Sequence, residues 1–125
     1  MPSDDPFFRI LCVEGNPAFQ QLLKIALGRY GFDVMTAVHG YDALMQYKAS
    51  QGQFGAIISN DDLPQMNGLH FVGVVRKAGY KGQIIIISGR QQRRELTKYE
   101  PHGISGFFHK PFDMAMLATM LLCAE

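Results

Sequence analysis

Hydrophobic and polar positions follow two patterns that alternate along the chain. Short apolar runs, rich in β-branched and aromatic residues and bounded by glycine or asparagine, are typical of buried strands. They cover residues 9–13, 33–37, 55–59, 83–88 and 106–109. Between them, apolar residues recur every three or four positions, which is the helical period, over residues 17–30, 41–50, 69–78, 92–99 and 112–123. The pattern predicts five strands alternating with five helices.

The first helical stretch has the clearest period. Pro17 suits a first turn and Gly31 ends the helix. Its predicted buried stripe consists of Phe19, Leu22, Leu23, Ala26, Leu27 and Tyr30. Strands that are apolar throughout, such as residues 84–87, need cover on both faces, which indicates a parallel sheet between two helix layers. We therefore expect a three-layer α/β sandwich.

Length and composition fit one globular domain, with 125 residues, 47% hydrophobic and 18% charged. A formal net charge of +1 argues against a nucleic-acid-binding domain. The polar start is not a signal peptide, and no apolar run reaches the roughly 18 residues of a membrane span. Cys12 and Cys123 form no disulfide framework, which suits a cytoplasmic protein, and the four histidines share no metal-ligand spacing. We expect a flexible N-terminal segment over residues 1–7 and one domain over residues 8–125.

Polar motifs follow four of the five predicted strands. Glu14-Gly15 follows the first strand, a loop from Asn60 to Gly68 follows the third, Ser88-Gly89 closes the fourth, and His109-Lys110-Pro111-Phe112 closes the fifth. Ligands of open α/β sheets bind at the carboxyl ends of the strands. The sequence therefore places its candidate site at that edge.

These four motifs, in this order, resemble those of the receiver domain of two-component response regulators, the CheY-like family, over residues 9–122. The resemblance implies a flavodoxin-like fold with a five-stranded parallel sheet of order 2-1-3-4-5 and five helices. It also implies a phosphorelay signalling domain and not an enzyme.

The family's functional positions can be matched one by one. In the family, two acids after the first strand bind Mg²⁺, an aspartate ending the third strand accepts a phosphoryl group, a Ser/Thr and a lysine contact that group, and an aromatic on the fifth strand acts as a switch. The matching positions are Glu14 and Gly15 for the acids, Asn60 for the phosphoacceptor, Ser88 and Lys110 for the phosphoryl contacts, and Phe107 for the switch. Two of the three acids are replaced.

The replacements change the expected chemistry. The amide of Asn60 does not ionise and its nitrogen lone pair is delocalised, so it lacks the anionic oxygen that attacks phosphorus. Mg²⁺ is held through carboxylates and phosphate oxygens, whereas Glu14 with Lys110 has a net charge of about zero. We expect a direct Glu14–Lys110 ion pair, weak or absent Mg²⁺ binding and no other cofactor. The main prediction is a pseudo-receiver that acts through protein-protein contacts.

An alternative is a receiver that is phosphorylated or ligand-gated through a shifted acid. Asp61 and Asp62 both follow Asn60. Strand alternation points Asp61 away from the site, so Asp62 is the candidate, with a bridge to Arg90 across the mouth of the pocket.

The last helical stretch is apolar nearly all round. Phe112, Leu117 and Leu121 suffice to cover the sheet, which leaves Met116 and Met120 facing outward as a candidate docking patch. The same surface is expected if this helix is cut short from a longer chain.

In the family, the fourth helix, fifth strand and fifth helix form the usual partner face, which would include Arg90 and Arg94. We expect a protein partner (a histidine kinase, phosphotransfer or effector domain), a homodimer through this face, and neither nucleic acid nor membrane as a partner.

Overall fold

The computed structural model describes residues 5–63, 65–89 and 97–123. Five parallel strands form one sheet in the order β2-β1-β3-β4-β5, which confirms the predicted order. The strands are β1 (Arg9–Val13), β2 (Asp33–Ala37), β3 (Ala56–Asn60), β4 (Gln83–Ser88) and β5 (Gly106–His109). Four of them have the predicted bounds, while β3 begins and ends one residue later than predicted, so that Asn60 is its last residue.

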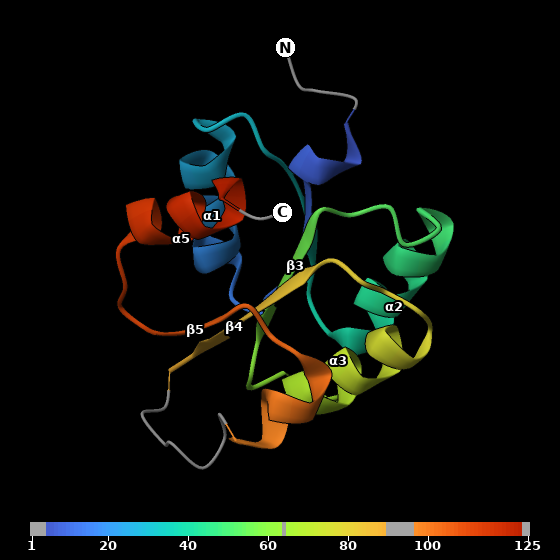
Figure 1. The fold of residues 1–125 in the computed structure, drawn as a ribbon. Helices are drawn as coiled ribbons and strands as arrows, with labels where there is room; N and C mark the ends of the chain where they lie inside the picture. The colour runs from blue at the N-terminus through green and yellow to red at the C-terminus, as the bar shows by residue number, and fades with distance from the viewer. Residues whose placement is uncertain (1–4, 64, 90–96, 124–125) are drawn as a thin grey trace.

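Two layers of helices cover the sheet (Figure 1). On one face lie α1 (Pro17–Gly28) and α5 (Met114–Leu122), and on the other lie α2 (Gly40–Ala49) and α3 (Gly68–Lys77). Two short 3-10 helices, η1 (Pro6–Phe8) and η2 (Glu100–His102), complete the described elements. The helix predicted over residues 92–99 falls mostly outside the described residues. No helix in the described part of the chain is long and apolar enough to cross a membrane.

Each of the four α-helices that begin within the described residues starts at a polar residue whose side chain accepts a hydrogen bond from the first turn. Asn16 caps α1, His39 caps α2 through Nδ1, Asn67 caps α3 and Asp113 caps α5. Such caps satisfy backbone N–H groups that have no partner within the helix. Asn16, His39 and Asp113 follow β1, β2 and β5 after short loops, so these helices start close to the carboxyl ends of those strands.

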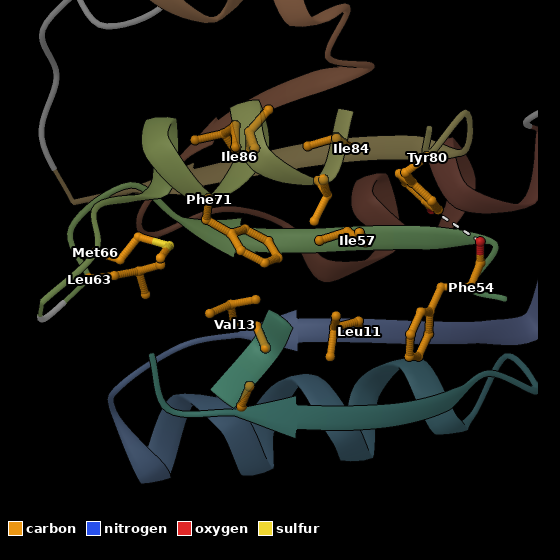
Figure 2. Packing of buried hydrophobic residues seen from close by; sticks show 14 of the residues in the cluster. Leu11, Val13, Phe54, Ile57, Leu63, Met66, Phe71, Tyr80, Ile84 and Ile86 are labelled. Atoms are coloured by element: carbon orange, nitrogen blue, oxygen red, sulfur yellow. Dashed lines mark hydrogen bonds between the residues drawn. The ribbon is translucent and has the colours of Figure 1, made fainter. Parts of the chain in front are cut away.

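The core consists of two apolar clusters, one on each face of the sheet, because successive strand residues point to opposite sides. Figure 2 shows the first cluster, in which Leu11, Ile57 and Ile84 of the strands pack against Phe71 of α3. At the right of the view the buried hydroxyl of Tyr80 donates a hydrogen bond to the carbonyl of Phe54, at 3.1 Å. The second cluster packs Ile10, Cys12, Ile58, Ile85 and Ile87 against α1 and α5.

Helix α1 buries a narrower stripe than the sequence predicts. Leu23 and Leu27 are fully buried in the second cluster, whereas Leu22 is 49% and Tyr30 is 44% exposed. The helix ends at Gly28, so Tyr30 lies beyond it, and Leu22 is turned about 100° from Leu23 around the axis. The prediction that both line the buried stripe is therefore wrong.

Helix α5 also differs from the prediction at one of its methionines. Leu117 and Leu121 are buried as predicted and Met116 is 62% exposed, but Met120 is partly buried against the second cluster. The reason is Gly106 of β5, where an added Cβ would lie 2.5 Å from the sulfur of Met120. The missing side chain opens a space on the sheet that Met120 fills, so Met120 does not face outward.

Arg76, in the last turn of α3, joins the segments that lead into β4 and β5 at the amino-terminal edge of the sheet. Its guanidinium donates to the backbone carbonyls of Tyr80 and Gly82, which precede β4, and of His102 and Gly103, which precede β5. Burial lowers the pKa of Arg76. The same edge is closed by Phe7 of η1, which packs against the second cluster at the predicted boundary of the domain. The boundary itself stays a prediction.

Candidate functional site

The predicted site residues gather at the carboxyl edge of the sheet. Glu14 directly follows β1, Asn60 ends β3, Ser88 ends β4 and Lys110 directly follows β5. Because the strands are parallel and in register, with Asn60 opposite Ile87 on β4, these ends meet at one edge. The sequence therefore brings together one carboxylate, one amide, one hydroxyl and one ammonium group.

Glu14 is the centre of this arrangement. Only 3% of the residue is exposed, and its carboxylate accepts three hydrogen bonds. Oε1 accepts from Nδ2 of Asn60 at 2.9 Å and from Nζ of Lys110 at 2.9 Å, and Oε2 accepts from the backbone N–H of Asn16 at 2.8 Å. The predicted Glu14–Lys110 ion pair is thus confirmed. Three donors satisfy this buried charge, as such a charge requires.

Lys110 is held on a second side by an aromatic ring. Its ammonium lies 4.1 Å from the centroid of the Phe19 ring on α1, a cation–π distance. Its backbone N–H donates to the carbonyl of Ser88 at 2.8 Å, which fixes the start of the side chain. With 28% of its side chain exposed, against 4% for Glu14, Lys110 lies on the solvent side of the ion pair.

The orientation of the Asn60 amide follows from its two neighbours. A carboxylate only accepts hydrogen bonds, so the amide NH₂ faces Glu14, and the amide oxygen accepts from the backbone N–H of Asp62 at 3.1 Å. The side chain of Asp62 is exposed. Its predicted bridge to Arg90 lies outside the described residues, as does Arg94. Gly15 is exposed and contributes no side chain.

The remaining predicted positions lie around this centre. Ser88 is buried, with 1% exposed. Phe107 of β5 packs against the first cluster, on the side of α2 and α3. Asp61 points away from Glu14, as strand alternation predicted, and accepts a hydrogen bond from the hydroxyl of Tyr99. Sequence patterns gave no reason to include Phe19 or Tyr99, since both are apolar positions of helical stretches.

The charge of the Glu14 carboxylate is matched by that of the Lys110 ammonium, with which it forms an ion pair. Within the described residues no group of three His, Cys, Asp or Glu side chains is arranged to hold a metal ion. Beneath the site, burial raises the pKa of the Cys12 thiol, and the negative charge of Glu14 adds to the effect. Cys12 is therefore a neutral, unreactive thiol. The local chemistry is that of one buried carboxylate matched to one ammonium and one amide.

Comparison with known proteins agrees with the fold. The model of the response regulator receiver domain family matches residues 10–122. The chain belongs to this family. It is therefore a receiver domain of two-component signal transduction, which is a signalling and not a typical enzymatic module.

Several receivers are similar to this one. The alkaline phosphatase synthesis transcriptional regulatory protein SphR of Synechococcus elongatus is 27% identical over 118 residues, which is 89% of this chain and 46% of that protein. The chemotaxis protein CheY4 of Vibrio cholerae has a TM-score of 0.83 and 27% identity, over 94% of this chain and 98% of that one. The CheY of a CheX-CheY-BeF3-Mg complex from Borrelia burgdorferi shares the fold, with a TM-score of 0.85 at 21% identity over 92% of this chain and 87% of that one. This receiver spans less than half the length of the curated relatives it matches.

Proposed function

We propose that this chain is a pseudo-receiver, which is not phosphorylated at Asn60 and signals through contacts with other proteins. The observation that carries the proposal is the double contact at Glu14 Oε1, which accepts from both Asn60 and Lys110 at 2.9 Å. Each of those contacts takes a place that a working receiver would give to a metal ion or to a phosphoryl group. No catalytic residue is assigned.

The first argument concerns Mg²⁺. The ion takes oxygen ligands in near-octahedral geometry and gives up its water reluctantly, so it needs carboxylates with open lone pairs. At Glu14 both carboxylate oxygens already accept hydrogen bonds, and Oε1 also carries the Lys110 ion pair. A dication would have to displace the Lys110 ammonium and rotate the Asn60 amide away from Glu14. It would gain no second carboxylate, because Gly15 has no side chain. We infer that Mg²⁺ binding is weak or absent.

The second argument concerns the phosphoryl group. Asn60 has no anionic oxygen, and its amide oxygen is occupied by the Asp62 N–H. Lys110 would have to stabilise the transferred group, yet its ammonium is held between Glu14 and the Phe19 ring. Phosphorylation or ligand gating through Asp62 is the alternative, but its side chain is exposed and its backbone N–H is bonded back to Asn60.

We infer a protein partner: a histidine kinase, phosphotransfer or effector domain, or a second copy through the α5 and β5 face. Met116 and Leu122 support that face, because they are 62% and 42% exposed on α5. SphR is named as a regulatory protein, and one similar CheY is described in complex with CheX, which is a protein contact made by this fold. We also propose that the domain spans residues 8–125, acts in the cytoplasm and binds no nucleic acid.

The test is to incubate the protein with Mg²⁺ and acetyl phosphate and to measure its intact mass. We expect no phosphoryl adduct. The matched control is the double variant Asn60→Asp, Gly15→Asp, which restores the family's acids and should gain one phosphoryl group. A phosphorylated wild-type protein contradicts the proposal, and loss of that adduct in Asp62→Asn would favour the shifted acid.

An amide NMR titration with Mg²⁺ and then beryllofluoride examines the same pocket without a covalent step. For a pseudo-receiver, the signals of Glu14, Asn60, Ser88 and Lys110 stay in place. Shifts that saturate at these four residues would show a working phosphoryl site and would overturn the proposal.

A further inference from the structure

Asp61, the residue next to Asn60, is joined to a distant part of the chain. Its Oδ1 accepts a hydrogen bond from the hydroxyl of Tyr99, which lies 38 positions further along. Tyr99 is buried, with only 1% exposed, at the end of the segment that leads into η2. A hydrogen bond to a charged acceptor is stronger than one between neutral groups, and more so away from water.

The backbone of Asp61 is fixed on both sides, so its carboxylate has little freedom. Its N–H donates to the carbonyl of Ile87 on β4 at 2.8 Å, and its own carbonyl accepts from the N–H of Gly68 at 3.1 Å. Gly68 lets the two partners meet. A Cβ at Gly68 would lie 2.5 Å from the carbonyl oxygen of Asn60 and 2.9 Å from the Tyr99 hydroxyl. A larger residue would have to displace the backbone of Asn60 and Asp61 or the tyrosine hydroxyl.

The ring of Tyr99 in turn contacts the aromatic of β5. Its centroid lies 6.1 Å from that of Phe107 at an interplanar angle of 66°, an edge-on contact. Phe107 packs inward against the first cluster, and its other side meets the ring of His109 at 5.2 Å. A chain of direct contacts therefore runs from the end of β3 to the switch position on β5 without passing through Ser88.

We propose that Asp61 and Tyr99 form a latch that holds Phe107 in its inward position with no phosphoryl group present. This inference rests on the proposed function, because a receiver that is never phosphorylated needs another means of fixing its switch residue. Asp61 and Tyr99 are positioning residues. They act through the packing of Phe107.

The test compares Tyr99→Phe, which removes one hydroxyl and keeps the ring, with the wild-type protein. Selectively labelled phenylalanine reports the χ1 rotamer of Phe107 and its exchange on the millisecond scale by NMR relaxation dispersion. Because one such hydrogen bond biases an equilibrium by about tenfold, we expect the outward rotamer of Phe107 to rise about tenfold in the variant. Asp61→Asn keeps an acceptor oxygen and should restore most of the inward population relative to Asp61→Ala.

Tyr30→Phe is the matched control, because Tyr30 is 44% exposed and lies outside the latch. All samples contain chelator and no phosphoryl donor, so the outcome does not depend on phosphorylation. A single inward rotamer of Phe107 in both Tyr99→Phe and Asp61→Ala would overturn the latch and leave the proposed function standing. Uptake of Mg²⁺ and beryllofluoride by the wild-type protein would overturn the proposed function and leave the rotamer result unchanged.

Discussion

Replacing Asn60 by aspartate places a carboxylate oxygen where the amide nitrogen now lies, 2.9 Å from Oε1 of Glu14. The change turns a hydrogen bond into a contact between like charges at a buried carboxylate. At an effective dielectric constant of about 20, the repulsion at that distance is about 6 kcal/mol. Lys110 attracts both carboxylates and the new side chain can rotate, so this value is an upper bound. We expect the variant to lose about 3 kcal/mol of unfolding free energy in the presence of chelator.

Magnesium should then distinguish the two proteins. The Asn60→Asp variant offers two adjacent carboxylates, and a cation that binds only the folded state stabilises it by mass action. In urea denaturation, millimolar Mg²⁺ should recover most of the lost stability of this variant and leave the wild type unchanged at matched ionic strength. Asn60→Ala, which removes the donor without adding charge, should lose about 1–2 kcal/mol and show no response to Mg²⁺.

Two results would refute this reasoning. One is an aspartate variant that is as stable as the wild type in chelator, because the amide would then not be a donor that Glu14 needs. The other is a wild-type protein that gains as much from Mg²⁺ as the variant, because Glu14 would then bind the ion despite its ion pair with Lys110.

Three further outcomes are expected. Lys110→Gln leaves the buried Glu14 carboxylate with neutral donors only. Because the lysine side chain is 28% exposed, we expect urea denaturation to show a loss of about 1–3 kcal/mol in unfolding free energy. Adding Glu14→Gln should recover part of that loss. Burial raises the pKa of Cys12 and of Tyr80. At alkaline pH the folded protein therefore keeps two protons that the unfolded chain loses. Stability should therefore be full below about pH 9 and fall above it by up to about 1.4 kcal/mol per pH unit for each group, and Tyr80→Phe should flatten the profile. In a thiol titration of the native protein, exposed Cys123 should react at once and buried Cys12 only after unfolding; rapid reaction of both would contradict the buried position of Cys12.

The sheet was predictable from the sequence because its strands are apolar runs, which are buried on both faces only when a parallel sheet lies between two layers of helices. Four strands have the predicted bounds, and the spatial order follows the motif resemblance. Helix faces were less predictable. Leu22 satisfies the helical period and is nevertheless 49% exposed. A helix that packs on one face of a sheet buries only the narrow stripe that faces the sheet, which in α1 contains Leu23 and Leu27.

Within the site, charge was a better guide than spacing. The ion pair between Glu14 and Lys110 was predictable because two opposite charges that follow strands of one parallel sheet lie at the same edge and attract each other. The contact of Tyr99 with Asp61 was not, since a tyrosine in an apolar stretch is equally consistent with plain core packing. The inward packing of Met120 depends on the absent side chain of Gly106, which becomes a neighbour only in the folded sheet.

The guanidinium of Arg76 binds four backbone carbonyls at the end of the sheet opposite to Glu14 and Asn60. These four contacts lie away from the carboxyl edge, so substitutions at Gly15 or Asn60 leave them in place. Arg76 thus gives the sheet a support that is separate from its candidate functional edge, and that edge can be altered residue by residue while the opposite edge stays joined.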